Sequence, residues 1–145
     1  MKGIYVLTIS INGDVHVEIG ALGKIFFRKG VYVYVGSAQN SLEKRVERHL
    51  AKEKVNFWHI DYLLENEQAN VVKVFCKKAA KTEECKVAQK LEKKGVSIPN
   101  FGCSDCDCIS HLFLIDKSNY PCSYLSSVLN DLSFSHYNVN CGHIS

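Results

Sequence analysis

The sequence predicts a small α+β domain in which helices flank a mainly antiparallel sheet. Short runs before residue 36 alternate apolar and polar residues and are rich in β-branched side chains, which is typical of strands. Later segments repeat apolar residues at helical spacing, and a chain of 145 residues suits one domain. We therefore predict a single domain over residues 1–145, with a core at about 3–115 and a C-terminal helix and tail at 116–145.

The predicted strands begin with a hairpin. Gly3–Ile11 and Asp14–Ile19 flank Asn12-Gly13, and Asn-Gly suits a two-residue turn because both central positions need positive φ. Three more strands are predicted after further turns. In the second of them, Tyr32 and Tyr34 should share one face. These segments are Ile25–Phe27, Val31–Val35 and, later in the chain, Val71–Cys76. A strand over His111–Ile115 follows a loop at 99–108.

Four helices are predicted between and after these strands. The first covers about Ser41–Ala51, with Asn40 as N-cap and Glu43 completing a capping box. The others are His59–Leu64, a helix from Thr82 that ends at Gly95, and Tyr124–Leu132.

Composition excludes little about function. The net charge of +3 permits nucleic-acid binding without requiring it. We expect no membrane association, because no run of 18 apolar residues occurs. Seven cysteines, an odd number without a secretory signal at the N-terminus, favour reduced thiols and a cytoplasmic protein.

Helical geometry separates three basic residues of the first helix. Each residue advances about 100° around the axis, so His49 and Arg45 border the apolar stripe of Leu42 and Val46. Arg48 should point to solvent. An arginine at the edge of a buried face either binds an anion or extends its charged head into water.

Glu84 is placed in a similar way on the third helix. It precedes Val87, Ala88 and Leu91 by three, four and seven positions, so it should face the sheet from the first turn. A carboxylate there complements the helix dipole, and a bound metal ion would be a second reason for it to face inward.

The motifs in this order resemble the GIY-YIG nuclease superfamily. They are Gly3-Ile4-Tyr5, then Tyr34-Val35-Gly36, then Leu42-x-x-Arg45-x-x-x-His49, and an inward Glu84. More closely, the chain resembles a compact branch that occurs alone or fused to endonuclease-III-type DNA glycosylases. The segments that carry this likeness are Tyr32–Ala38, Trp58–Leu64, Glu84-Cys85, Phe101-Gly102 and Ser110–Phe113.

The resemblance implies a metal-dependent endonuclease that hydrolyses phosphodiester bonds, in DNA rather than RNA and in a repair or processing context. Tyr5 would deprotonate or orient the attacking water, and Tyr34 would position the nucleophile or the phosphate. Arg45 would hold the phosphate, His49 would tune a tyrosine, and Glu84 would ligate Mg²⁺ or Mn²⁺. A tyrosine needs neighbouring positive charge to act as a base near neutral pH.

Two departures from the family pattern stand out. The superfamily usually keeps its two tyrosine motifs one hairpin apart, whereas here an extra hairpin-like insertion at 12–30 separates Tyr5 from Tyr34. The tyrosines still meet if the insertion loops out. An asparagine that many members carry after the catalytic helix has only Asn100 as a candidate here.

Further residues are candidates for binding nucleic acid or metal. Lys44, Arg45, Arg48, Trp58 and His59 are candidates for nucleic-acid contacts, with Trp58 either stacking on a base or packing in the core. The spacing of Cys103, Cys106, Cys108 and His111 offers four ligands for Zn²⁺, and buried reduced thiols are the alternative.

Two other functions remain open at the level of sequence. One is a catalytically inactive nucleic-acid-binding domain that serves a DNA-repair glycosylase on another chain. The other is a zinc-stabilised interaction module. The presence of all five candidate catalytic residues favours the nuclease, and their convergence on one cleft is the test.

Overall fold

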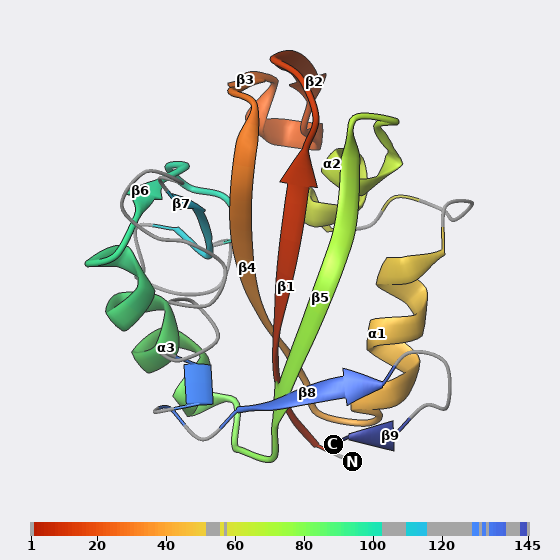
Figure 1. Ribbon diagram of the computed structural model, residues 1–145, viewed down its shortest axis with the longest axis vertical. Helices are drawn as coiled ribbons and strands as arrows, with labels where there is room; N and C mark the ends of the chain where they lie inside the picture. The colour runs from red at the N-terminus through yellow and green to blue at the C-terminus, as the bar shows by residue number, and fades with distance from the viewer. Residues whose placement is uncertain are drawn as a thin grey trace.

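The computed structural model describes residues 2–51, 56, 58–102, 110–115, 129–130, 132, 134–138 and 143–144. Its main sheet has the strand order β6-β7-β4-β1-β5-β8-β9, and β2 pairs with β3 in a separate two-stranded ribbon (Figure 1). All strand pairs among the described residues are antiparallel. The predicted α+β class is therefore confirmed.

The strands have the following bounds. They are β1 (Gly3–Ile11), β2 (Val15–Glu18), β3 (Lys24–Phe27), β4 (Gly30–Ala38), β5 (Ala69–Lys77), β6 (Val96–Ser97), β7 (Leu112–Ile115), β8 (Ser135–Asn138) and β9 (His143–Ile144). A short 3-10 helix, η1 (Gly20–Leu22), lies between β2 and β3. The sequence did not predict β6, β8 or β9, because none of them shows a strand-length run of alternating residues.

The predicted hairpin at Asn12-Gly13 is wrong. β1 lies in the middle of the sheet and pairs along its length with β4 on one side and β5 on the other. Both edges of β1 are therefore taken, and β2 pairs with β3 instead. Among the described non-glycine residues only Asn100 has positive φ, so Asn12 does not adopt the turn that the dipeptide suggested. The extra hairpin predicted between the two tyrosine motifs does form, as the β2–β3 ribbon.

Helices cover both faces of the sheet, α1 and α2 on one and α3 on the other (Figure 1). Alternation along the strands divides the core accordingly. The tyrosines of β1 and β4 point to the first face and the valines to the second, as predicted for β4. Apolar side chains of α1 and α2 pack on the tyrosine face, whereas Val87, Ala88 and Leu91 of α3 pack on the valine face.

The helices begin and end close to the predicted positions, with two corrections. They are α1 (Leu42–Leu50), α2 (His59–Glu65) and α3 (Thr82–Glu92). The N-cap of α1 is Ser41 and not Asn40, because the Ser41 hydroxyl accepts the Lys44 N–H. α3 ends at Glu92, before Gly95, and Gly95 instead lies so close to the Leu114 carbonyl that a Cβ would not fit.

The C-terminal prediction is testable only in part. Leu129 and Asn130 are helical, and the rest of the helix predicted over 124–132 lies largely outside the described residues. Within the described part of the chain, no helix is long and apolar enough to cross a membrane.

Candidate functional site

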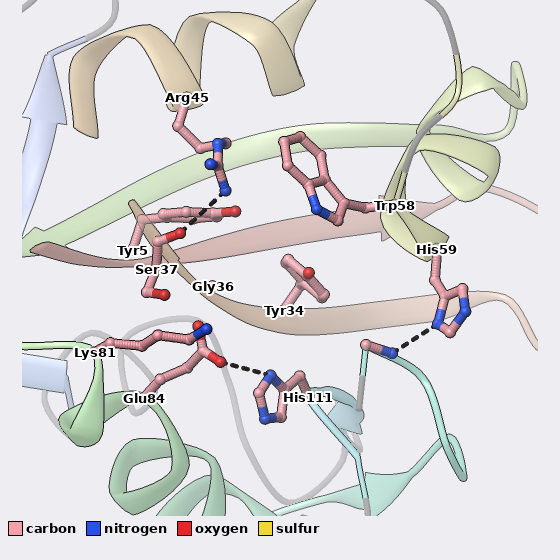
Figure 2. Close-up of a pocket in the computed structure, with 11 residues that line it drawn as sticks. Tyr5, Tyr34, Gly36, Ser37, Arg45, Trp58, His59, Lys81, Glu84 and His111 are labelled. Carbon is pink, nitrogen blue, oxygen red and sulfur yellow. Dashed lines mark hydrogen bonds and ion pairs between the residues drawn. The ribbon is translucent and has the colours of Figure 1, made fainter. Parts of the chain in front are cut away.

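A polar cleft of about 200 Å³ opens beside the C-terminal half of β4 (Figure 2). Side chains from α1, α2 and α3 reach it together with the tyrosines of β1 and β4. The residues that line it are Tyr5, Tyr34, Gly36, Ser37, Arg45, Trp58, His59, Lys81, Glu84, Gly102 and His111. Four of the five predicted catalytic residues are in this set, and the fifth, His49, lies behind Tyr5.

Register brings the two tyrosines together despite the insertion between them. Tyr5 is opposite Gly36 and Leu7 is opposite Tyr34, so Tyr5 and Tyr34 are diagonal neighbours on one face. Their ring centroids are 6.4 Å apart. The insertion forms its own ribbon and does not disturb this pairing.

Gly36 makes room for the ring of Tyr5. A Cβ on Gly36 would come within 2.8 Å of Tyr5 Cε2 and still closer to Cζ and the hydroxyl oxygen. The glycine of the Tyr34-Val35-Gly36 motif is therefore required by its cross-strand partner. Because Gly36 has no side chain, the Tyr5 ring can lie across β4 at this position and reach the cleft.

Tyr5 and His49 form a buried polar pair. The Tyr5 hydroxyl lies 2.6 Å from His49 Nε2, and both residues are 2% exposed. Burial raises the pKa of Tyr5 well above its ordinary value, although Arg45 opposes the shift. Burial, together with neighbouring Tyr5, also raises the pKa of Tyr34. Both tyrosines are thus neutral phenols near pH 7.

Arg45 reaches the cleft from α1, as predicted. Its Nη1 donates to the Ser37 carbonyl at 3.1 Å, and its guanidinium carbon lies 4.2 Å from the centre of the Trp58 ring. These contacts hold the guanidinium at the cleft wall. The Ser37 carbonyl uses one N–H of the guanidinium, so other N–H groups remain to bind an anion.

Arg48 does not point to solvent, which corrects the prediction. It donates through both terminal nitrogens to the Asp61 carboxylate, at 2.7 and 2.9 Å, and also lies over Trp58 at 4.4 Å. Asp61 is completely buried on α2. A helical wheel of α1 shows only the residues of that helix, so it could not reveal that α2 places an anionic side chain beside Arg48. Arg48 remains outside the cleft lining, as expected.

Glu84 reaches the same cleft from the opposite face of the sheet. β7 pairs with β4 only at Val31–Tyr34, and among the described residues no strand covers this edge at Gly36 and Ser37. The first turn of α3 brings Glu84 to the cleft that Gly36 and Ser37 also line. Glu84 is 8% exposed, and its Oε1 lies 3.3 Å from Nδ1 of His111, which is buried.

The remaining predicted contact residues divide into two groups. Trp58 and His59 line the cleft, whereas Lys44 is exposed and does not. His59 Nδ1 accepts the Gly102 N–H at 2.9 Å, which leaves Nε2 as the protonated nitrogen of the neutral ring. Burial lowers the pKa of His59 and favours that neutral form. Asn100 is exposed and does not line the cleft.

Sequence reasoning missed Asp61 as a member of this region and assigned His111 to a different site. Asp61 carried a usable signal, because on a helical wheel it lies about 60° from Leu64, at the edge of the buried stripe of α2. Lys81 immediately precedes α3, and from the sequence Lys73, Lys77, Lys78 and Lys81 are either a basic face beside Glu84 or a solvated lysine face; of these four, Lys81 lines the cleft. His111 was grouped with the nearby cysteines because they are close in sequence.

The cleft offers one carboxylate to a metal ion. Among the described residues, no group of three or more His, Cys, Asp or Glu side chains could hold a metal. Mg²⁺ commonly binds through one or two carboxylates plus water and substrate phosphate, so Glu84 alone fits such a site. The predicted zinc ligands Cys103, Cys106 and Cys108 lie outside the described residues, and that site stays a prediction. Cys76, within them, is a buried free thiol.

Fold and cleft together define a small α+β domain whose polar site combines paired tyrosines, an arginine and a buried carboxylate. The chain belongs to the family described as "Domain of unknown function DUF123", whose model matches residues 4–134. None of the curated proteins and none of the solved structures compared with the chain matched it.

Proposed function

We propose that the protein is a divalent-metal-dependent endonuclease that hydrolyses phosphodiester bonds in nucleic acid, DNA rather than RNA. One observation carries the proposal. Arg45 and Glu84 come from helices on opposite faces of the sheet, yet both line the cleft that contains Tyr5 and Tyr34. The resemblance of these motifs to GIY-YIG nucleases supports the same chemistry and a role in DNA repair or processing.

Arg45 is suited to hold the scissile phosphate. Its guanidinium is planar and permanently charged, and it binds phosphate oxygens through parallel N–H groups. The contacts to Ser37 and Trp58 fix its direction before substrate arrives. Lys81 adds a second positive charge at the cleft, and His59 offers an N–H donor through Nε2.

Glu84 would hold the Mg²⁺ or Mn²⁺ ion. Such an ion, when bound, stabilises negative charge that develops on the leaving oxygen. His111 beside Glu84 restricts the orientation of the carboxylate. A buried carboxylate with a fixed direction loses little conformational entropy when it binds a cation.

Tyr5 acts on water as a neutral phenol. Its raised pKa rules out a standing phenolate near neutral pH, so it accepts a proton only as it passes its own proton on. His49 Nε2, 2.6 Å from the hydroxyl, is the adjacent group that can take it. Tyr34 faces the same space and orients the water or the phosphate.

The test is a cleavage assay on branched, damaged and single-stranded DNA, with matched RNA, in Mg²⁺ or Mn²⁺. Glu84→Gln should abolish cleavage and leave binding intact or slightly stronger, because a negative charge near phosphate is removed. Glu83→Gln is the matched control, since Glu83 is the preceding residue on α3 and pairs with Lys86 away from the cleft. It should cut like the wild type.

Two outcomes would contradict the proposal. Wild-type protein that binds the substrates but cuts none of them would indicate an accessory nucleic-acid-binding domain, for instance one that serves a repair glycosylase. Equal cleavage by wild type and Glu84→Gln would remove Glu84 as the metal ligand.

Binding itself should weaken steeply with salt, because phosphate contacts release counterions.

A further inference from the structure

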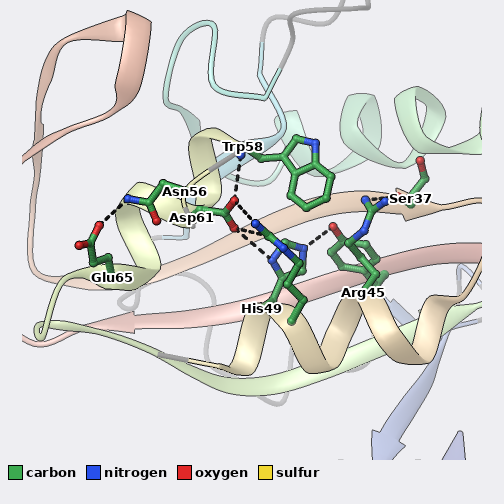
Figure 3. A network of polar contacts seen from close by, with 9 residues as sticks. Ser37, Arg45, His49, Asn56, Trp58, Asp61 and Glu65 are labelled. Carbon is green, nitrogen blue, oxygen red and sulfur yellow. Dashed lines mark hydrogen bonds and ion pairs between the residues drawn. The ribbon is translucent and has the colours of Figure 1, made fainter. Parts of the chain in front are cut away.

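Asp61 is a buried carboxylate at the junction of α1 and α2 (Figure 3). It accepts hydrogen bonds from the Arg48 guanidinium and, at 2.9 Å, from the Trp58 backbone N–H. Its Oδ1 also lies 3.9 Å from Nδ1 of His49. These contacts connect the start of α2 to two residues of α1. One is Arg48, which lies over Trp58, and the other is His49, which contacts Tyr5.

Helix capping and the ion pair explain only part of this arrangement. The bond to the Trp58 N–H caps α2, and the bond to Arg48 balances the buried charge. Neither role requires an imidazole between Asp61 and the cleft. Yet His49 is buried with Nε2 toward the Tyr5 hydroxyl and Nδ1 toward the Asp61 carboxylate.

We propose that Asp61 is a positioning residue that fixes His49 in the tautomer whose Nε2 accepts the hydroxyl proton of Tyr5. This inference rests on the proposed nuclease function and adds the group that orients its proton acceptor. A carboxylate only accepts hydrogen bonds, so the imidazole nitrogen that faces it carries the hydrogen. At 3.9 Å the contact is electrostatic, and such contacts often shorten when substrate binds.

This tautomer determines the direction in which Tyr5 works. With Nε2 as acceptor, the Tyr5 hydroxyl donates to His49, and its oxygen, which also accepts from the Arg45 side chain, keeps a second lone pair for a water molecule in the cleft. With the other tautomer, Nε2–H would donate to the Tyr5 oxygen and compete with that water. The carboxylate of Asp61 thus selects the form in which Tyr5 can accept a proton.

The proton transfers balance over one turnover. As the water oxygen bonds to phosphorus and the bond from phosphorus to the leaving oxygen breaks, the water proton moves to Tyr5. The Tyr5 proton moves to His49 Nε2, and Asp61 stabilises the resulting imidazolium. The leaving oxygen takes a proton from solvent. His49 then returns its proton to Tyr5, which releases one to solvent.

Asp61→Asn tests this arrangement because the amide nitrogen can donate to Nδ1 and favour the wrong tautomer. In hydrolases with an Asp-His pair, the same change lowers kcat about 10⁴-fold. Here we expect kcat to fall by about 10²–10⁴-fold, while KM and binding of uncleaved DNA stay close to wild type. Glu65→Gln is the matched control, because it makes the same chemical change on the same helix, where Glu65 bonds only Asn56 among the contacts drawn in Figure 3.

The tautomer is measured directly by ¹⁵N NMR of histidine-labelled protein, with His49→Gln to assign the signal. Wild type should show a protonated Nδ1 and a bare Nε2, and Asp61→Asn should show the reverse. A protonated Nε2 in the wild type would overturn the inference even if Asp61→Asn fails to fold. So would an Asp61→Asn variant with wild-type kcat. If wild-type protein cleaves nothing, only the nuclease function is refuted. The NMR measurement would still show which nitrogen of His49 carries the proton.

Discussion

Gly36→Ala is expected to disturb both the fold and the cleft through one contact. The new Cβ would stand 2.8 Å from Tyr5 Cε2, which is 3.4 − 2.8 = 0.6 Å closer than the start of ordinary van der Waals contact. Cζ and the hydroxyl oxygen would be closer still. The Tyr5 ring is buried and hydrogen-bonded to His49, so it cannot move away without losing that bond.

The expected size follows from two opposing effects. Forcing a methyl group into a packed site typically costs about 1–3 kcal/mol. Replacing glycine also lowers the entropy of the unfolded chain, which stabilises by about 0.4–1 kcal/mol. We therefore expect a net loss of about 1–2 kcal/mol. If the protein is a nuclease, activity should fall about 10²-fold, since a displacement of about 1 Å in a catalytic site has that effect.

Urea unfolding measures the loss. With an m-value of about 2 kcal/mol/M, the midpoint should drop by about 0.5–1 M. Gly13→Ala is the matched control, because a Cβ there meets only Gln68 Oε1, at 3.6 Å, and should change stability little or raise it. In a Tyr5→Leu background the cost of Gly36→Ala should largely disappear. A Gly36→Ala protein as stable as Gly13→Ala would refute the steric argument.

Three further predictions concern other parts of the molecule. Arg48→Ala should destabilise the fold by roughly 3–5 kcal/mol in a denaturant titration, because it leaves the Asp61 carboxylate without its ion pair; a loss below about 1 kcal/mol would contradict this. Burial raises the pKa of Tyr32 to about 12 and that of Tyr5 further, so the unfolded state ionises first. The tyrosine contribution to the unfolding free energy should therefore be constant below pH 10 and fall above it by up to about 1.4 kcal/mol per pH unit for each tyrosine, a slope that Tyr32→Phe should reduce. If the cysteine-rich loop before His111 binds zinc, protein purified without chelator should carry about one equivalent, and removing the metal should lower the melting temperature.

Local periodicity was enough to predict several features of the cleft. Alternation along β4 placed Tyr32 and Tyr34 on one face, because successive side chains of a strand point in opposite directions. The helical repeat likewise placed His49 and Glu84 toward the sheet, and both are buried. These properties depend only on residues a few positions apart, so the sequence alone determines them.

The arrangement between elements was decided by the tertiary structure. Asn12-Gly13 has the sequence of a hairpin turn, but β1 gains two full-length partners in the middle of the sheet and β2 pairs elsewhere. Arg48 lies on the polar side of its own helix, but α2 supplies a buried Asp61 beside it. In both cases a local preference yields to a contact with a distant segment.

The sequence by itself determined which faces of the strands and helices are apolar and which polar residues those faces include. Only the tertiary structure decided that Glu84 of α3 and Arg45 of α1, on opposite sides of the sheet, line one cleft. The physical reason lies in where β7 begins: within the described part of the chain its register with β4 reaches Tyr34, and the His111 carbonyl accepts the Val35 N–H just beyond it. Glu84 in the first turn of α3 lines the cleft together with the two tyrosines, and no periodicity in the chain records where the pairing of β4 with β7 stops.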